Sequence, residues 1–239
     1  MRIPTITGII DRRILVNYTV DPGVAKAIVP EPFTPKLYND KAIAGICLIR
    51  LKCVRPKGLP VFIGVGSEYG AHRIAVEWED NGQVNEGVYI PRRDSSSFFN
   101  ALVGGRVFPG RHYKAKFEVM EDGTRYHVGF TSSDGTSINV DAKRAADLNK
   151  GPIFKDMDTV SDFFRKGSAG YSPNGKKYEG LLLNTYEWKM EPLDVINVHS
   201  SFFENENTFP KGSVKFDNAL LMTNIAHEWS ALSDKVCGV

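Results

Sequence analysis

The chain has 239 residues, of which 42% are hydrophobic and 24% are charged, and this ordinary globular composition is enough for a substantial core. Its 30 basic and 28 acidic residues leave a net charge of +2, which argues against a protein that binds nucleic acid through bulk electrostatics. No apolar run approaches the roughly 20 residues of a spanning helix, so we expect no membrane segment.

The cysteines and the first residues of the chain indicate the cellular compartment of the protein. Cys47, Cys53 and Cys237 show no metal-binding spacing, and an odd number of scattered thiols is typical of a reducing environment. The charged run Asp-Arg-Arg at residues 11–13 interrupts any apolar stretch of signal-peptide length. We therefore expect a cytoplasmic protein.

Short alternating runs bounded by turn residues predict strands along most of the chain. In chain order they cover residues 14–20, 42–54, 72–78, 84–90, 112–120, 126–131, 137–140, 181–190 and 195–203. Gly123 and Gly135 stand in Asp-Gly turns, where we expect positive φ. The stretch 219–229 fits either a strand or a helix.

Capping patterns predict three short helices between the strands. They begin at the caps Asp21, Asp94 and Asp158 and end before Pro30, Gly104 and Gly167. Residues 166–177, rich in Gly, Ser and Lys, are the best candidate for a mobile loop. Many strands with few helices predict a predominantly β fold, an antiparallel barrel or folded sheet, in one domain over residues 1–239.

Neither a cofactor nor a metal is predicted. The segment Gly64-Val65-Gly66 lacks the third glycine and the following helix of a dinucleotide-binding fingerprint. The five histidines never pair at i, i+4, and no cysteine joins them in a ligand pattern.

Three segments resemble acetoacetate decarboxylases, in the order of that family. The run at residues 11–13 heads a strand and precedes the Val-Pro-Glu-Pro-Phe stretch at 29–33, and Arg12 matches a family arginine if one residue of slippage is allowed. Residues 64–70 resemble the segment around the family's active-site glutamate, on which Glu68 falls. Residues 105–109 resemble the family's Gly-Arg and Phe-Pro stretch, with a two-residue shortening.

The chain resembles a narrower group in the same superfamily more closely than it resembles the decarboxylases. This group consists of bacterial and archaeal conserved proteins of unknown function. The residues that carry this resemblance are Tyr89–Asp94, Phe108–Arg111, Ser200–Phe203 and His227–Trp229. It implies an antiparallel β cone with an internal cavity, and it implies no activity. The decarboxylases form oligomers, so we expect a homo-oligomer here.

One departure from the decarboxylases bears on the chemistry. After Phe-Pro that family carries two lysines, the first of which forms a Schiff base with a substrate ketone. Here the two positions hold Gly110 and Arg111, which offer no nucleophilic amine. The alternative is a relocated amine from Lys114 or Lys116, although strand alternation favours a solvated face for both.

The sequence therefore predicts a pocket for a small anionic organic acid. Arg12 and Arg111 are the candidate carboxylate-binding residues. Glu68 and His112 are the candidate acid or base of a lyase or hydratase reaction that needs no imine. Structural roles stay open for each of them: Arg12, for instance, can pair with Glu68. A non-catalytic binding or assembly module with a vestigial cavity is the third alternative.

Overall fold

The structure is a computed structural model, which describes residues 4–96, 109–148 and 153–236. It is predominantly β, as the sequence predicts. The strands are β1 Ile6–Val20, β2 Thr34–Pro35, β3 Leu37–Tyr38, β4 Lys41–Pro56, β5 Val65–Asp80, β6 Gln83–Ser95, β7 His112–Glu121, β8 Arg125–Ser132, β9 Ser137–Arg144, β10 Ala169–Asn174, β11 Lys177–Thr185, β12 Glu191–Ser200, β13 Val214–Ala231 and β14 Lys235–Val236. The helices are α1 Pro22–Ile28, α2 Met157–Lys166 and the short 3-10 turn η1 Val61–Ile63. None of these helices in the described ranges is long and apolar enough to cross a bilayer.

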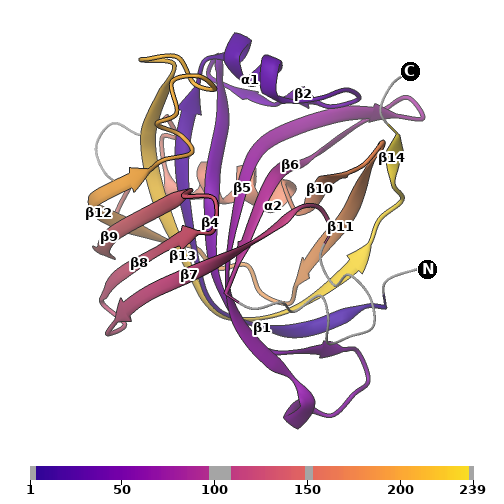
Figure 1. The fold of residues 1–239 in the computed structure, drawn as a ribbon, viewed down its shortest axis with the longest axis vertical. Helices are drawn as coiled ribbons and strands as arrows, with labels where there is room; N and C mark the ends of the chain where they lie inside the picture. The colour runs from indigo at the N-terminus through magenta and orange to yellow at the C-terminus, as the bar shows by residue number, and fades with distance from the viewer. Residues whose placement is uncertain (1–3, 97–108, 149–152, 237–239) are drawn as a thin grey trace.

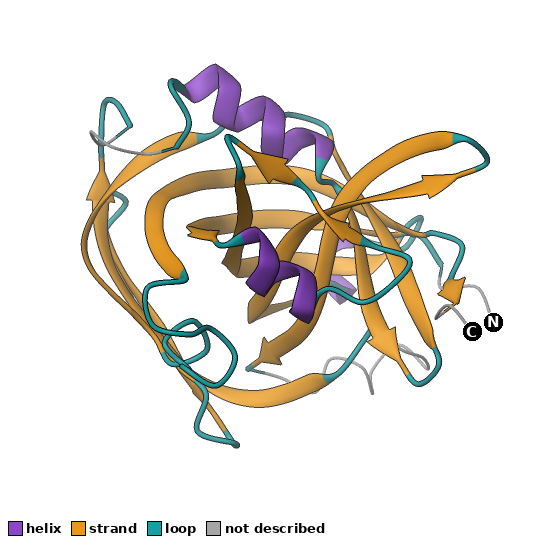
Figure 2. Cartoon of the chain, turned by 90° about the horizontal axis from the view of Figure 1, so that it is seen from above, coloured by secondary structure: helices purple, strands orange, loops and turns teal. Residues whose placement is uncertain are grey.

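The strands form one highly curved sheet that folds round on itself (Figure 2). Five long strands, in the order β13-β1-β4-β5-β6, are shared by two hydrogen-bonded circuits. One circuit closes through β10 and β11, and the other through β7, β8, β9 and β12. Figure 1 shows these two sets on opposite sides of the shared strands. The pairing is antiparallel except where β6 meets β7 and β10.

Because neighbouring residues of a strand point to opposite faces, each shared strand contributes to two cores. On β1, Ile14 and Val16 join the cluster that packs against α1 and β7–β9, whereas Leu15 joins the cluster that packs against α2. The β1–β4 register shifts between Ile10 and Arg12, where β1 contains one extra residue. This bulge places Ile10 and Arg13, which are three residues apart, in the same pocket.

Most of the expected elements are present, and the exceptions are the cap of α2, which is Asp156 and not Asp158, the predicted loop at residues 166–177 and the helix expected after Asp94. Gly123 and Gly135 have φ angles of 86° and 87°, and the ambiguous stretch 219–229 is part of strand β13. The predicted loop at residues 166–177 instead contains β10, because its small residues pair with β11 and β6. The helix expected after Asp94 fails at its start, since Asp94 and Ser95 end β6, and its remaining residues from 97 on lie outside the described residues.

Gly45 gives a test of the shared strands. It lies buried in β4, where an added Cβ would come within 2.3 Å of the Val16 carbonyl oxygen on β1. We expect Gly45→Ala to lower the free energy of unfolding by about 1–3 kcal/mol, because the backbones must separate. Gly23, in α1, has nothing within 4 Å of its Cβ position, so Gly23→Ala should leave stability unchanged or slightly raised. Urea denaturation of the two variants measures the difference, and equal midpoints would contradict this account of the packing.

Candidate functional site

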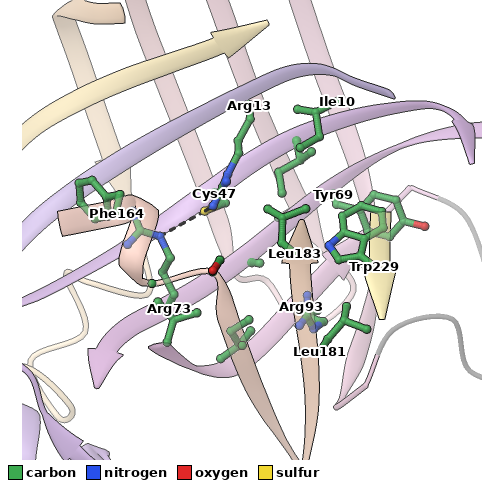
Figure 3. A pocket seen from close by; sticks show the side chains of 18 of the residues that line it. Ile10, Arg13, Cys47, Tyr69, Arg73, Arg93, Phe164, Leu181, Leu183 and Trp229 are labelled. Atoms are coloured by element: carbon green, nitrogen blue, oxygen red, sulfur yellow. Dashed lines mark hydrogen bonds between the residues drawn. The ribbon is translucent and has the colours of Figure 1, made fainter. Parts of the chain in front are cut away.

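A pocket lies between the shared strands, β10, β11 and α2 (Figure 3). Its cavity volume is about 90 Å³. The walls are largely apolar, and include side chains from six strands and from α2, among them Ile10, Leu51, Ile90, Phe164, Leu181 and Trp229. Apolar walls with a few convergent polar groups are the usual composition of a small-molecule site.

Three arginines reach this pocket from three strands: Arg13 from β1, Arg73 from β5 and Arg93 from β6. The sheet register explains their convergence, because Ala71, two residues from Arg73 on the same face of β5, pairs directly with Arg93. The guanidinium of Arg73 stacks on the ring of Phe164, 4.6 Å from its centroid, which holds the cation against the wall formed by α2.

Neutral groups and sulfur accept hydrogen bonds from these arginines. Arg73 Nη2 donates to Asn17 Oδ1, and Arg93 Nε donates to Ser172 Oγ at 3.4 Å. Arg13 donates to the Met222 sulfur at 3.9 Å. No carboxylate is found among the described residues that line the pocket. Burial lowers the pKa of Arg93 to about 10 and lowers the pKa of Arg73, because each cation has lost water.

Cys47 lies between two of these cations. Its Sγ accepts from Arg73 Nε at 3.2 Å and from Arg13 Nη2 at 3.6 Å. Burial alone would raise the pKa of the thiol, but the charges and hydrogen bonds of Arg73 and Arg13 outweigh it, and the net shift is downward. The pocket therefore combines cations with a sulfur whose ionised form those cations favour.

Arg12 and Glu68 are brought together by the fold, but outside the pocket. Arg12 Nη2 lies 2.5 Å from Glu68 Oε2, and Arg12 Nη1 lies 2.8 Å from Glu121 Oε2. Arg50 bridges the same two carboxylates from the other side, with its Nε 2.6 Å from Glu68 Oε1. We call these four residues the ion cluster. Both charges of the Arg12–Glu68 pair are satisfied within it, so the structure gives no support to Arg12 as a carboxylate-binding residue.

The other two site predictions also fall outside the pocket. Arg111 is exposed just before β7. His112 is half-buried at the start of β7, beside Arg93 in the parallel ladder, and is not among the described lining residues.

The relocated-lysine alternative finds no support on β7. Lys114 and Lys116 are exposed, and the side chain of Lys116 is 83% accessible. Ala115 and Phe117, between and beside them, pack into the core, so alternation turns both lysines outward. No lysine is found among the pocket residues in the described ranges.

The backbone at Gly110 also excludes a side chain there. Its φ is 93°, and an added Cβ would meet the Ser172 Cβ at 2.5 Å. Any L-residue at this position would be strained and would displace β10. The place that the resemblance pairs with a lysine is thus filled by Ser172 of the neighbouring strand.

Sequence reasoning missed Arg13, Arg73, Arg93 and Cys47. One signal was present: Arg73 interrupts an apolar run in β5, where an unpaired cation has to face a cavity or a partner. Arg13 could not be separated from Arg12, because only the bulge at residue 11 decides which of the two turns inward.

Several solved structures share this fold. Acetoacetate decarboxylase from Legionella pneumophila is 12% identical with a TM-score of 0.60, and the match covers 96% of this chain and 87% of that one. An acetoacetate decarboxylase-like enzyme from Sphingomonas wittichii RW1 is 8% identical with a TM-score of 0.58, covering 100% and 94%. The enduracididine biosynthesis enzyme MppR, complexed with pyruvate, is 9% identical with a TM-score of 0.57, covering 98% and 90%. At these identities the likeness concerns the fold.

No curated protein matches the sequence. A family model does match, over residues 10–221. This range includes all four residues of the ion cluster and the pocket-lining residues from Ile10 to Leu183. The chain belongs to the family DUF2071, described as an uncharacterized conserved protein, on a fold that it shares with acetoacetate decarboxylase.

Proposed function

We propose that this protein binds a short organic acid in the pocket, with the carboxylate held by Arg13 and Arg73. The observation that carries the proposal is a group of three guanidiniums, that of Arg73 buried and those of Arg13 and Arg93 partly buried, with no carboxylate among the described lining residues. A buried cation is costly unless an anion neutralises it. Arg73 is 3% exposed, and its Nη1 has no hydrogen-bond partner in the described chain. An incoming carboxylate would supply that partner.

The size of the pocket restricts the ligand. A cavity volume of about 90 Å³ is roughly the volume that three water molecules occupy in the liquid. This volume suits a short acid and is too small for a nucleotide cofactor. The apolar walls around Leu181, Leu183 and Trp229 would receive a short carbon chain. The pyruvate complex of MppR, on the same fold, agrees with an acid of this size.

The lining also bears on the chemistry. Lyase or hydratase chemistry without an imine remains our proposal, and its proton acceptor has to come from the pocket itself. Glu68 and His112 do not line it, whereas Cys47 does. The third alternative, a vestigial cavity, would require side chains to fill the space, and the open volume counts against it. The cytoplasmic location and the homo-oligomer stay predictions.

Calorimetric titration with acetate, pyruvate and acetoacetate tests the binding. We expect at least one acid to bind, and Arg73→Gln to raise its dissociation constant at least ten-fold, since one charge-assisted hydrogen bond contributes about 1.5–3 kcal/mol. Arg13→Gln should weaken binding as well. Acetone serves as the uncharged control ligand and should bind far more weakly than pyruvate.

The matched control variant is Arg125→Gln, which removes an exposed arginine from β8, away from the pocket. It should leave the affinity unchanged. Equal affinity of the acid for the wild type, Arg73→Gln and Arg13→Gln would refute the proposal, as would acetone binding as tightly as pyruvate. Circular dichroism of each variant verifies that it has folded.

A further inference from the structure

Among the described residues that line the pocket, Cys47 carries the one strongly nucleophilic atom, its Sγ. It lies in the middle of β4, and pairs with Leu15 of β1 and Ala71 of β5. These neighbours hold its backbone between the strands that carry Arg13 and Arg73. The side chain is 3% exposed, so reagents reach it through the pocket.

The two guanidiniums favour the ionised form of the sulfur. Arg73 Nε is 3.2 Å and Arg13 Nη2 is 3.6 Å from Sγ, and no carboxylate among the described lining residues competes for either cation. A thiolate beside arginines is the arrangement in which a cysteine becomes reactive near neutral pH. The opposite shift, which burial alone would cause, is outweighed.

A second feature points to a ligand beside the sulfur. The same guanidinium that binds Sγ through Nε has a second donor, Nη1, which is buried and has no hydrogen-bond partner in the described residues, and Arg73 is one of the residues that line the pocket. Arg73 and Cys47 line the same cavity of about 90 Å³, so an acid held there by the guanidinium would lie beside Sγ. Proximity of this kind converts a weak nucleophile into an effective one.

We infer that Cys47 is the nucleophile of this pocket, and that the ligand class is a short acid with an electrophilic carbon next to its carboxylate, such as a 2-oxo acid. This inference rests on the proposed function. The sulfur adds to the carbonyl carbon, a carbon–sulfur bond forms, and the carbonyl electron pair moves to oxygen. That oxygen takes a proton from water, which leaves hydroxide and gives a hemithioketal. No oxidant or other co-reactant is required.

Alkylation with two reagents of equal shape tests the inference. Iodoacetate carries a carboxylate and iodoacetamide is uncharged, and with either one a sulfur–carbon bond forms while iodide leaves with the electron pair. Peptide-resolved mass spectrometry compares Cys47 with Cys53, a second free cysteine with a partly exposed side chain. At pH 6.5 we expect iodoacetate to modify Cys47 at least ten-fold faster than Cys53, although Cys47 is the more buried.

The charge of the reagent provides the decisive contrast. Cys47 should react faster with iodoacetate than with iodoacetamide, and this preference should fall at least ten-fold in Arg73→Gln. Arg125→Gln should keep it. Modification of Cys47 no faster than Cys53 with both reagents between pH 6 and pH 8 would overturn the inference, and so would a preference that survives both Arg73→Gln and Arg13→Gln.

A Cys47→Ser variant separates this inference from the proposed function. It should still bind the acid in calorimetry, because the arginines remain, and should form no adduct at residue 47. Arginine-dependent binding together with an inert Cys47 in the wild type would overturn the nucleophile and leave the binding site intact. Absence of acid binding in both the wild type and Cys47→Ser would overturn the proposed function instead.

Discussion

Arg12→Met is expected to lower the free energy of unfolding by about 3 kcal/mol, because it removes the cation that two carboxylates share. Arg12 is 2% exposed, and its ion pairs to Glu68 and Glu121 lie partly buried. After the substitution, Arg50 alone faces both carboxylates. This expected loss lies at the lower end of the range for buried ion pairs, because the side chains of Glu68 and Glu121 are still partly exposed to solvent. Urea denaturation at pH 7 measures it.

The adjacent residue provides the control. Arg13→Met removes the arginine one position further along β1, whose guanidinium donates to the sulfurs of Cys47 and Met222. We expect it to cost less than half as much stability as Arg12→Met. Acid binding should respond in the opposite order, with a loss in Arg13→Met and wild-type affinity in folded Arg12→Met. If the acid affinity depended on Arg12 and not on Arg13, the binding site would lie at the ion cluster and not in the pocket.

The fold was largely predictable, because alternation and turn chemistry are local. Residues 112–120 alternate so regularly that the packed and solvated faces of β7 follow from the letters alone. β10 was missed because its residues, Gly, Ser and Pro among them, have low strand propensity, and its pairing partners lie far away in β6 and nearby in β11. Tertiary pairing overrode the local preference there.

The site was less predictable, because it depends on which side of a strand each residue faces. The pairing of Arg12 with Glu68 was foreseen as one of two alternatives, but its exclusion from the pocket was not. A single extra residue at position 11 reverses the facing of everything before it on β1, and a bulge leaves no clear mark in one sequence. Arg92 and Arg93 are adjacent in the sequence, yet Arg92 binds Asp94 and Asp134 while Arg93 turns into the pocket.

His72 gives the fold a dependence on pH. Its ring is fully buried, with the ring of Phe202 at 4.2 Å and the rings of Phe203 and Phe130 farther out, and neither ring nitrogen has a hydrogen-bond partner among the described residues. Burial, together with the nearby charge of Arg92, lowers the pKa of His72 to about 3. The unfolded chain has the ordinary histidine pKa of about 6.5.

The sign of the effect follows from these two values. Between pH 6.5 and pH 3 the unfolded state binds the proton and the folded state does not, so stability falls as the pH falls through this window. At pH 5 the loss relative to pH 7 is about 2 kcal/mol for His72. Burial also lowers the pKa of His227 to about 4, which adds a loss of similar size. The charged neighbours Asp94, Arg92 and Asp134 stay bound to one another, and burial raises the pKa of Asp94, which acts in the opposite direction.

Replacing His72 by phenylalanine isolates its share. At pH 7 we expect His72→Phe to fold with a stability within about 1 kcal/mol of the wild type, since two unsatisfied buried nitrogens are removed and the aromatic packing is kept. At pH 5 the variant should be more stable than the wild type by about 2 kcal/mol, because it has no proton to lose on folding. His199→Gln, on an exposed side chain, is the control and should keep the wild-type slope. Parallel slopes of the wild type and His72→Phe in urea unfolding between pH 7 and pH 5 would mean that His72 takes up its proton in the folded protein as readily as in the unfolded chain, and would contradict a buried, neutral His72.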